Sequence, residues 1–231
     1  MRPEEFSDAL KRRGIEIDDR MMEQFDLYAK YLKEYNEKIN LTAITDYEEV
    51  LDKHFYDSLL VMKGQMTGTL ADVGSGAGFP GVVLKIANPG LHVTLIEPIR
   101  KRCVFLESLI EKLSLKGIEV VCARGEDYSL KHREDYDFVT ARAVSNLNGL
   151  IEVCGAMVKT GAYFIAMRGK DGRAEIDDAK KAIETMGFSV EEIRDEQIFN
   201  GDQRVIAWLK KEKKTPLKYP RKYNIIKKNP L

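Results

Sequence analysis

The fold is decided by the stretch Leu70-Ala-Asp-Val-Gly-Ser-Gly-Ala-Gly-Phe-Pro-Gly81, in which a short apolar run ends in an acid and then in glycines. A helical pattern of apolar residues begins after Pro80, which suits a first helical position because it lacks an N–H. The stretch predicts a strand, a tight turn and a helix, with free backbone N–H groups of the turn facing a polar ligand. A glycine-rich connector that binds nothing is the alternative interpretation.

The acid inside this motif separates two kinds of nucleotide site. Gly76, Gly78 and Gly81 fit the dinucleotide pattern G-x-G-x-x-G, but Asp72 precedes them in the spacing Asp-x-Gly-x-Gly-x-Gly. A carboxylate repels a pyrophosphate and attracts the ammonium and sulfonium groups of S-adenosylmethionine. No Lys-Ser or Lys-Thr follows the loop, which excludes a P-loop. We therefore expect S-adenosylmethionine as the cofactor, bound by Asp72, Gly74, Gly76 and Gly78 among others.

Two further turns extend this expected cofactor site. The second predicted strand ends at Glu97, 23 positions beyond Gly74, where doubly wound folds place an acid that binds ribose hydroxyls. A helix-capping acid before Arg100 is the alternative. The segment 123–127 follows the third strand, where such folds place backbone and an acid beside an adenine ring. A plain surface turn explains this segment almost as well.

Composition limits the class of protein but not its function. The chain has 231 residues, of which 44% are hydrophobic, and this suits one large domain with a small appendage. Its 37 basic and 37 acidic residues create no net field for nucleic acid. The three cysteines are too widely spaced for a disulfide framework or a zinc site: Cys103, Cys122 and Cys154. The three histidines share no metal-ligand spacing, so we expect no metal: His54, His92 and His132.

We expect a cytoplasmic monomer that does not contact a membrane. The chain opens without a signal peptide, and no apolar run approaches the roughly 18 residues that a membrane span needs.

Three segments of different character follow one another along the chain. Residues 1–66 predict a helical appendage, with helices at 3–14 and 18–38 and a third after a capping-box pattern at Thr45 and Glu48. Residues 67–212 alternate strand and helix patterns, which predicts a doubly wound, mostly parallel seven-stranded sheet. Its last two strands flank Asn200-Gly201, a hairpin signal, so the sheet is expected to end in an antiparallel strand.

Residues 213–231 form a basic C-terminal tail. From Arg204 to Leu231 the chain has ten Lys or Arg against one acid, with Trp208, Tyr219 and Tyr223 interleaved. Basic side chains beside planar rings are typical of RNA binding. A solvated and partly disordered tail is an equally good interpretation of this composition.

Basic residues also follow two central strands. Arg142 comes just after the fourth strand, where a planar cation could orient a substrate carbonyl or phosphate, or could merely pair with Asp137 or Glu152. We expect Arg142 to be the catalytic residue and to contact the cofactor. Arg168, Lys170 and Arg173 follow the fifth strand and form a second basic edge.

The absence of two sequence motifs limits which atom can accept the methyl group. The chain has no Asn/Asp-Pro-Pro-Tyr/Phe, which exocyclic amino methylation uses, and no cysteine follows a proline. The acceptor is then an atom that is already nucleophilic, such as guanine N7, whose in-plane lone pair needs no general base.

Taken together, several motifs resemble the ribosomal small-subunit methyltransferase G family, also called glucose-inhibited division protein B. The resemblance covers essentially the whole chain and is carried by these segments: Asp72–Gly81, Arg124–Asp127, Ala141–Ala143, Ile39–Thr42, His54–Leu59 and the tail residues Tyr219-Pro-Arg and Pro230-Leu231. It implies a class I, Rossmann-like methyltransferase that uses S-adenosylmethionine to methylate N7 of one guanine in 16S rRNA, in a loop beside the decoding centre. The partner implied is the small ribosomal subunit.

The resemblance also implies site residues. The family's cofactor contacts fall on Gly74, Phe79, Glu97, Pro98, Ile99, Gly125, Glu126 and Arg142. We place His54, Arg168, Lys170 and Arg221 on the substrate side, although His54 also fits a packed helix residue. Arg168 departs from the family, in which many members have Lys before the glycine that corresponds to Gly169. Two other functions stay open: a nucleotide-binding or RNA-binding module without turnover, and methylation of a small molecule or a protein.

Overall fold

The computed structural model describes residues 1–142 and 146–231 and contains a seven-stranded sheet in the order β3-β2-β1-β4-β5-β7-β6. Strands β1 to β5 run parallel, and β7 pairs antiparallel with both β5 and β6. The predicted doubly wound sheet with an antiparallel end is therefore confirmed. The strands are β1 (Gly68–Val73), β2 (Leu91–Ile96), β3 (Ile118–Val121), β4 (Tyr136–Arg142), β5 (Val158–Arg168), β6 (Phe188–Gln197) and β7 (Gln203–Lys211).

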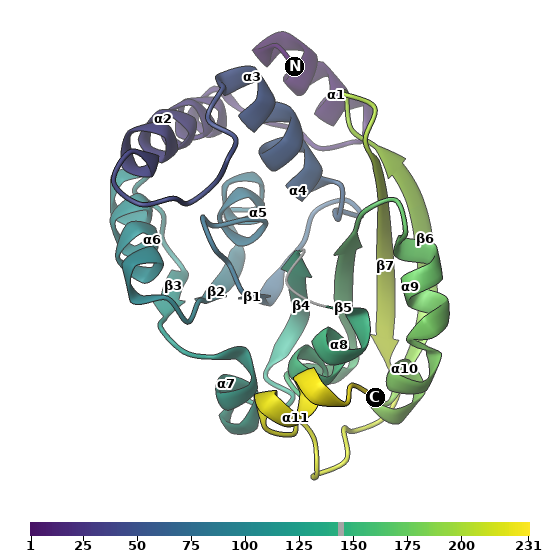
Figure 1. Ribbon diagram of the computed structural model, residues 1–231. Helices are drawn as coiled ribbons and strands as arrows, with labels where there is room; N and C mark the ends of the chain where they lie inside the picture. The colour runs from purple at the N-terminus through teal and green to yellow at the C-terminus, as the bar shows by residue number, and fades with distance from the viewer. Residues whose placement is uncertain (143–145) are drawn as a thin grey trace.

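Helices cover both faces of the sheet (Figure 1). They are α1 (Pro3–Arg12), α2 (Asp19–Asn36), α3 (Tyr47–Val50), the π-helix η1 (Leu51–Tyr56), α4 (Asp57–Leu59), α5 (Gly81–Ala87), α6 (Arg100–Lys112), α7 (Gly125–Lys131), α8 (Leu147–Gly155), α9 (Gly172–Asp178), α10 (Lys180–Thr185) and α11 (Tyr223–Lys228). Successive strand residues face opposite sides. Leu70 thus belongs to a hydrophobic cluster with α1, α2, α5 and α6, whereas Ala71 belongs to a second cluster with α8, α10 and α11.

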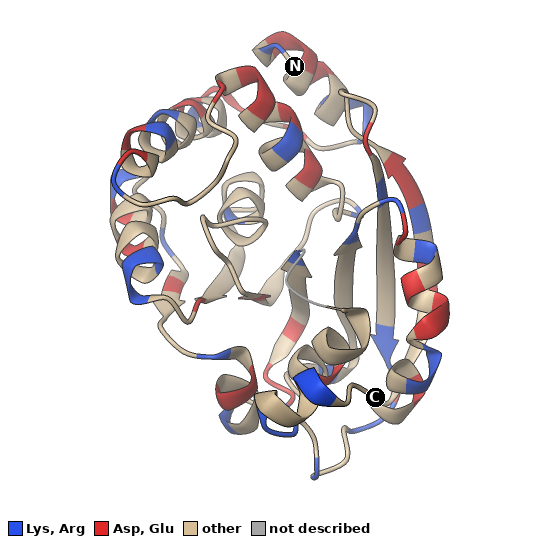
Figure 2. Cartoon of the chain, viewed as in Figure 1, with Lys and Arg blue, Asp and Glu red and all other residues tan. Residues whose placement is uncertain are grey.

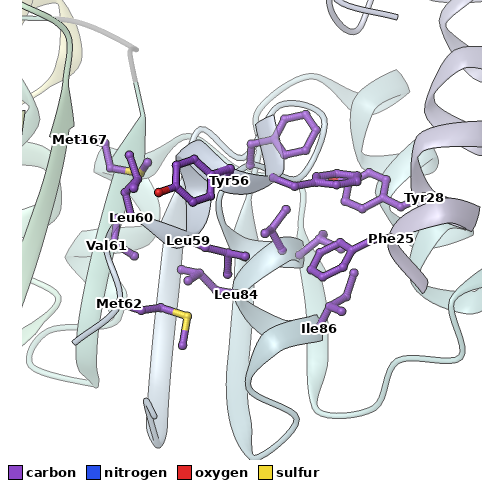
Figure 3. Packing of buried hydrophobic residues seen from close by; sticks show 14 of the residues in the cluster. Phe25, Tyr28, Tyr56, Leu59, Leu60, Val61, Met62, Leu84, Ile86 and Met167 are labelled. Atoms are coloured by element: carbon purple, nitrogen blue, oxygen red, sulfur yellow. The ribbon is translucent and has the colours of Figure 1, made fainter. Parts of the chain in front are cut away.

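The N-terminal helices pack on the sheet domain rather than standing apart from it. Phe25 and Tyr28 of α2 point toward Leu84 and Ile86 of α5 (Figure 3), and all four side chains are buried. Phe25 and Tyr28 are thus core residues, while Tyr31 and Tyr35 of the same helix are partly buried against this cluster. Burial of one such side chain contributes roughly 1.5 to 3 kcal/mol to folding, which is enough to fasten this segment to the sheet.

Several element boundaries differ from those predicted. The third helix begins after Asp46, whose side chain accepts from the amide of Glu49, so the predicted capping box at Thr45 is wrong. It continues into η1, and π-helical turns occur frequently at functional sites. The apolar pattern predicts a helix near 147–158, but α8 ends at Gly155 and β5 begins at Val158, where the chain pairs with Tyr136 of β4. The pattern also predicts one helix over 175–186, but the structure has two, α9 and α10, divided at Ala179.

The C-terminal segment is folded onto the second face of the sheet. Tyr219 of the tail is buried there, and Trp208 of β7 is buried in the cluster on the other face, so neither ring can stack on RNA bases. Arg133 donates to the carbonyls of Thr215 and Tyr219 at 2.8 and 2.7 Å. The prediction of a solvated, partly disordered tail is therefore wrong for this part of the chain. Basic side chains stay exposed along it at Lys213, Lys214, Lys218, Lys222, Lys227 and Lys228.

Charges of both signs alternate over the helices, and the upper tips of β4 and β5 are basic (Figure 2). These tips carry Arg142 and Arg168. No helix in the described part of the chain is long and apolar enough to cross a membrane.

Candidate active site

The backbone amides of the glycine loop donate mainly to carbonyls of the loop itself and of the neighbouring strand β2. The amides of Gly74 and Ser75 both donate to the carbonyl of Ile96, at 2.8 and 3.2 Å. Further along, the amides of Gly78 and Phe79 donate to the carbonyl of Ser75 at 2.7 and 3.1 Å. The prediction that the turn offers free N–H groups is therefore wrong for these amides. A loop whose donors are already used is poorly suited to a pyrophosphate, which agrees with the preference for a cationic ligand.

Close packing explains two of the loop glycines. A Cβ at Gly78, where φ is +99°, would lie 2.6 Å from the hydroxyl of Tyr28. A Cβ at Gly81 would lie 2.4 Å from a methyl carbon of Leu95. Both distances are far below van der Waals contact, so these positions accept only glycine in this arrangement. The hydroxyl of Tyr28 also donates to the carbonyl of Ala77, which ties α2 to the loop.

Asp72 supports the loop from behind. One carboxylate oxygen accepts from the amide of Gly81 at 2.9 Å, and the side chain is fully buried. Its other oxygen, Oδ1, has no hydrogen-bond partner among the described residues. Burial raises the pKa of Asp72 to about 7, so the carboxyl is only partly ionised near neutral pH. Asp72 shapes the turn, and its predicted attraction to a cationic cofactor stays a prediction.

Glu97 joins the loop to the next strand. Its Oε2 accepts from the amide of Gly76 and its Oε1 from the amide of Ile99, both at 2.9 Å. A carboxylate has about four acceptor positions, so each oxygen can accept one more bond. The side chain is only 2% exposed, yet it borders a cavity. Glu97 therefore accepts from the amides of the two turns, as a capping acid does, and still has acceptor positions for the predicted ribose hydroxyls.

The first cavity has a volume of about 490 Å³, within the range of ligand sites. Many of its lining residues were predicted as cofactor contacts: Gly74, Gly76, Phe79, Glu97, Pro98, Ile99 and Arg142. Asp72, Gly78, Gly125 and Glu126 are not among the residues that line it. Gly125 instead packs closely, because a Cβ there would lie 2.8 Å from Val73 and 2.9 Å from Val153. The carboxylate of Glu126 accepts from Arg124 at 2.6 Å.

Arg142 and His54 meet over the ring of Phe79. The imidazole stacks on this ring with centroids 4.3 Å apart, and the guanidinium carbon lies 4.9 Å from the ring centroid. Arg142 approaches Nδ1 of His54 at 3.3 Å and a carboxylate oxygen of Asp57 at 3.4 Å. Burial, with Arg142 nearby, lowers the pKa of His54 to about 3, so the ring is neutral at physiological pH.

The alternative pairings of Arg142 do not occur. Asp137 accepts from Lys159 at 2.8 Å, and Glu152 accepts from Arg221 at 2.8 and 2.6 Å. Position 143 of the Ala141–Ala143 motif lies outside the described residues. Of the remaining predicted substrate residues, Arg168 forms an ion pair with Glu175, and Lys170 is exposed. Arg221 contacts α8. It lines neither the first cavity nor the second cavity, which is described next, so its substrate role stays a prediction.

A second cavity of about 510 Å³ lies beyond this pair of side chains. His54 and Arg142 line both cavities and therefore form their common wall. Sequence reasoning missed Lys53, Asp57 and Arg204, which also line the second cavity. The available signal was the His54–Leu59 motif, which carries Asp57 although it lies outside the glycine-loop domain. A third cavity, beside His92 and Asp135, lies at the amino ends of the strands, where open α/β sheets do not bind ligands.

Comparison with known proteins identifies the family. Residues 21–204 match the family described as rRNA small subunit methyltransferase G. The chain is 43% identical to the ribosomal RNA small subunit methyltransferase G of Lactobacillus acidophilus, with 100% of each chain covered. It is 42% identical to the protein of the same name from Bacillus subtilis, over 100% of this chain and 99% of that one.

Solved structures agree on the fold alone. A SAM dependent methyltransferase from Aquifex aeolicus has a TM-score of 0.55 at 19% identity, covering 76% of this chain and 97% of that one. Because these two relatives match from end to end at 43% and 42% identity, the sequence relationship is decisive. The chain belongs to the rRNA small subunit methyltransferase G family.

Proposed function

We propose that this protein transfers a methyl group from S-adenosylmethionine to N7 of a guanine in the 16S rRNA of the small ribosomal subunit. The observation that carries the proposal is the common wall of the two cavities. His54 and Arg142 line both the cavity beside the glycine loop and the adjoining cavity, which carries several arginines. Donor and acceptor in adjoining cavities can meet at this wall, which is what direct transfer between two bound molecules requires.

The first cavity fits S-adenosylmethionine because it offers negative charge and free hydrogen-bond acceptors. The carboxylate of Glu97 keeps one acceptor position on each oxygen for ribose hydroxyls, and Ile99 and Phe79 add apolar walls. The partly ionised Asp72 lies behind the loop and favours a cation over an anion. When bound, the cofactor supplies an electrophilic methyl group on its sulfonium. Gly125 and Glu126 remain candidates for the adenine side.

The acceptor side needs orientation rather than proton transfer. Guanine N7 carries an in-plane lone pair at neutral pH, so the attack requires no general base. Neutral His54 suits this requirement, because it neither protonates N7 nor adds a charge to the wall. The guanidinium of Arg142 can donate to the O6 carbonyl of guanine and so hold the base plane. The role of this chain is then alignment and electrostatic support.

Labelled methyl transfer tests the proposal. Purified 30S particles and naked 16S rRNA are incubated separately with labelled cofactor, and N7-methylguanosine is mapped by borohydride and aniline cleavage. We expect a single cleavage position that depends on the enzyme. Binding of the cofactor and RNA without transfer would support the module without turnover. Transfer to a protein or a small molecule but not to RNA would favour the other alternative.

A further inference from the structure

The second cavity is distinguished by its charges. Four cationic side chains and two carboxylates line it: Lys53, Arg142, Arg168, Arg204, Asp57 and Asp202. Lys53 also pairs with Glu49, and Arg168 pairs with Glu175, whereas Arg142 and Arg204 both face Asp57. A cleft lined by guanidinium groups can concentrate anionic ligands.

Asp57 holds two of these cations at once. Its Oδ1 accepts from Nε of Arg204 at 2.9 Å, and its Oδ2 lies 3.4 Å from a terminal nitrogen of Arg142. The three residues come from α4, β7 and β4, so the carboxylate connects segments that are far apart in the sequence. Asp57 is only 4% exposed, and burial raises its pKa while the two guanidinium groups oppose that rise. Asp57 is shared by the two arginines, and Arg204 has a second, longer ion pair with Asp202.

Arg204 keeps hydrogen-bonding capacity for a ligand. A guanidinium has five N–H donors. Nε of Arg204 is used by Asp57, and one terminal nitrogen donates to the carbonyl of Gln203 at 3.0 Å. The other terminal nitrogen is 3.9 Å from a carboxylate oxygen of Asp202, which is longer than a hydrogen bond. The remaining donors belong to a side chain that is 20% exposed and lines the cavity.

We propose that Arg204, held in place with Arg142 by the buried Asp57, binds a phosphate group of the acceptor RNA strand in the second cavity. Arginine suits this task because its planar fork can bind two phosphate oxygens together. Asp57 is then a positioning residue that reaches the RNA only through the two arginines. The inference rests on the proposed function, since it takes RNA as the acceptor.

The salt dependence of RNA binding tests the phosphate contact. Affinity for 30S particles is measured at several salt concentrations for the wild type, Arg204→Gln, Arg204→Lys and the control Lys181→Gln on exposed α10. Loss of one phosphate contact reduces the slope of log affinity against log salt by about 0.7 to 0.9. We expect this reduction in Arg204→Gln, a retained slope with weaker binding in Arg204→Lys, and no change in Lys181→Gln.

The variant Asp57→Asn tests whether Asp57 positions the two arginines or acts only through its negative charge. The substitution removes a negative charge from a basic cavity, so an electrostatic effect alone would tighten RNA binding. If Asp57 positions the arginines, kcat/KM for 30S particles falls on the order of tenfold or more instead. The Kd for S-adenosylmethionine, measured by calorimetry, should stay within about twofold, which also reports that the protein is folded.

The outcomes distinguish this inference from the proposed function. A wild-type protein that transfers no methyl group to RNA overturns the proposed function. An active wild type whose salt slope is unchanged in Arg204→Gln overturns the phosphate site. Tighter RNA binding and undiminished turnover in Asp57→Asn overturn the positioning role. If Asp57→Asn does not fold, the two Arg204 variants still decide the question.

Discussion

The two ends of the chain both lie outside the sheet, but they do different things. The N-terminal region reaches the active site, where Tyr28 holds the glycine loop and His54 and Asp57 contact Arg142. The C-terminal segment packs on the opposite face, where Arg221 pairs with the buried Glu152 of α8. Figure 1 shows the helices α3 and α4 above the tips of β4 and β5, and α11 beside α7 and α8 below.

The amino-acid composition of the two ends would suggest the opposite roles. The tail is basic and aromatic and resembles an RNA-binding segment, whereas the N-terminal helices resemble ordinary amphipathic packing. In the folded protein, several rings and charges of β7 and of the tail that follows it are used internally. Lys211 is fully buried and donates to the carbonyls of Gly155 and Met186 at 2.8 and 2.6 Å. Composition therefore does not tell which end serves the reaction, because each polar group can be satisfied by protein or by ligand.

The largest expected effect is on turnover, in the contact between the N-terminal region and β4. Arg142→Ala should lower kcat for methyl transfer on the order of a hundredfold or more, because the group that aligns the acceptor is lost. The matched control is Arg194→Ala, since Arg194 also binds the N-terminal region, through the carbonyl of Leu60 at 2.7 Å. The control should lose stability but keep activity per folded molecule. Equal loss of melting temperature and activity in Arg142→Ala would make its role structural.

The next effect concerns stability at the C-terminal end. Arg221→Gln leaves the fully buried Glu152 without its cation, which should reduce the free energy of unfolding by roughly 3 kcal/mol. Urea denaturation measures the change, and the double variant with Glu152→Gln should recover part of it. Affinity of the folded variant for 30S particles should stay at the wild-type value. A clear loss of RNA affinity would instead support Arg221 as a substrate-binding residue.

Cofactor affinity should depend on the sheet domain and not on the C-terminal end. Glu97→Ala removes the acceptor for ribose hydroxyls and for two loop amides, so the binding free energy should weaken by roughly 1 to 3 kcal/mol. Tyr223→Ala is the comparison, because Tyr223 stacks on Arg124 at 4.4 Å, next to the expected adenine side. Calorimetry should give an almost unchanged Kd for that variant. Unchanged affinity in Glu97→Ala would remove Glu97 from the site.

A smaller effect follows from the buried Lys211. Burial lowers the pKa of Lys211 to about 7, whereas the unfolded chain keeps the lysine protonated up to about 10.4. Between these values the unfolded state binds more protons, so stability should rise with pH, by at most about 1.4 kcal/mol per pH unit. Urea denaturation between pH 7 and 9 should show this slope in the wild type and lose it in Lys211→Met. Parallel curves would mean that the carbonyls of Gly155 and Met186, with the hydroxyl of Thr215, keep the folded lysine charged.

The smallest effect concerns the exposed lysines of the tail. Removing residues 213–231 would also break the pair between Arg221 and Glu152, so point substitutions give a cleaner test. Replacing Lys213, Lys214 and Lys218 by Gln should flatten the salt slope of 30S binding by at most about 2 units. Lys180→Gln with Lys181→Gln on α10 serves as the control. An identical slope in the tail variant would give the tail a purely structural role.

Much of the site was predictable because its residues lie at strand ends. Glu97 and Arg142 follow apolar runs, and the carboxyl ends of parallel strands meet at one edge of the sheet. The pairing of Arg142 was not predictable, since its partner Asp57 is 85 positions away and lies in α4, directly after the π-helix η1. Arg204 was also missed, because a basic residue at the start of a late strand carries no local signal of a cavity.

The sequence by itself determined the alternation of strands and helices, the glycine turn and the family. These features depend on local periodicity, on backbone conformations that glycine permits, and on short motifs, all of which are read from neighbouring residues. The tertiary structure decided which polar groups remain available to ligands. The loop amides, Glu152 and Lys211 are satisfied within the protein, whereas Arg142 and Arg204 share one carboxylate beside a cavity. A buried polar group must find a partner, and only the folded chain determines whether that partner is protein or ligand.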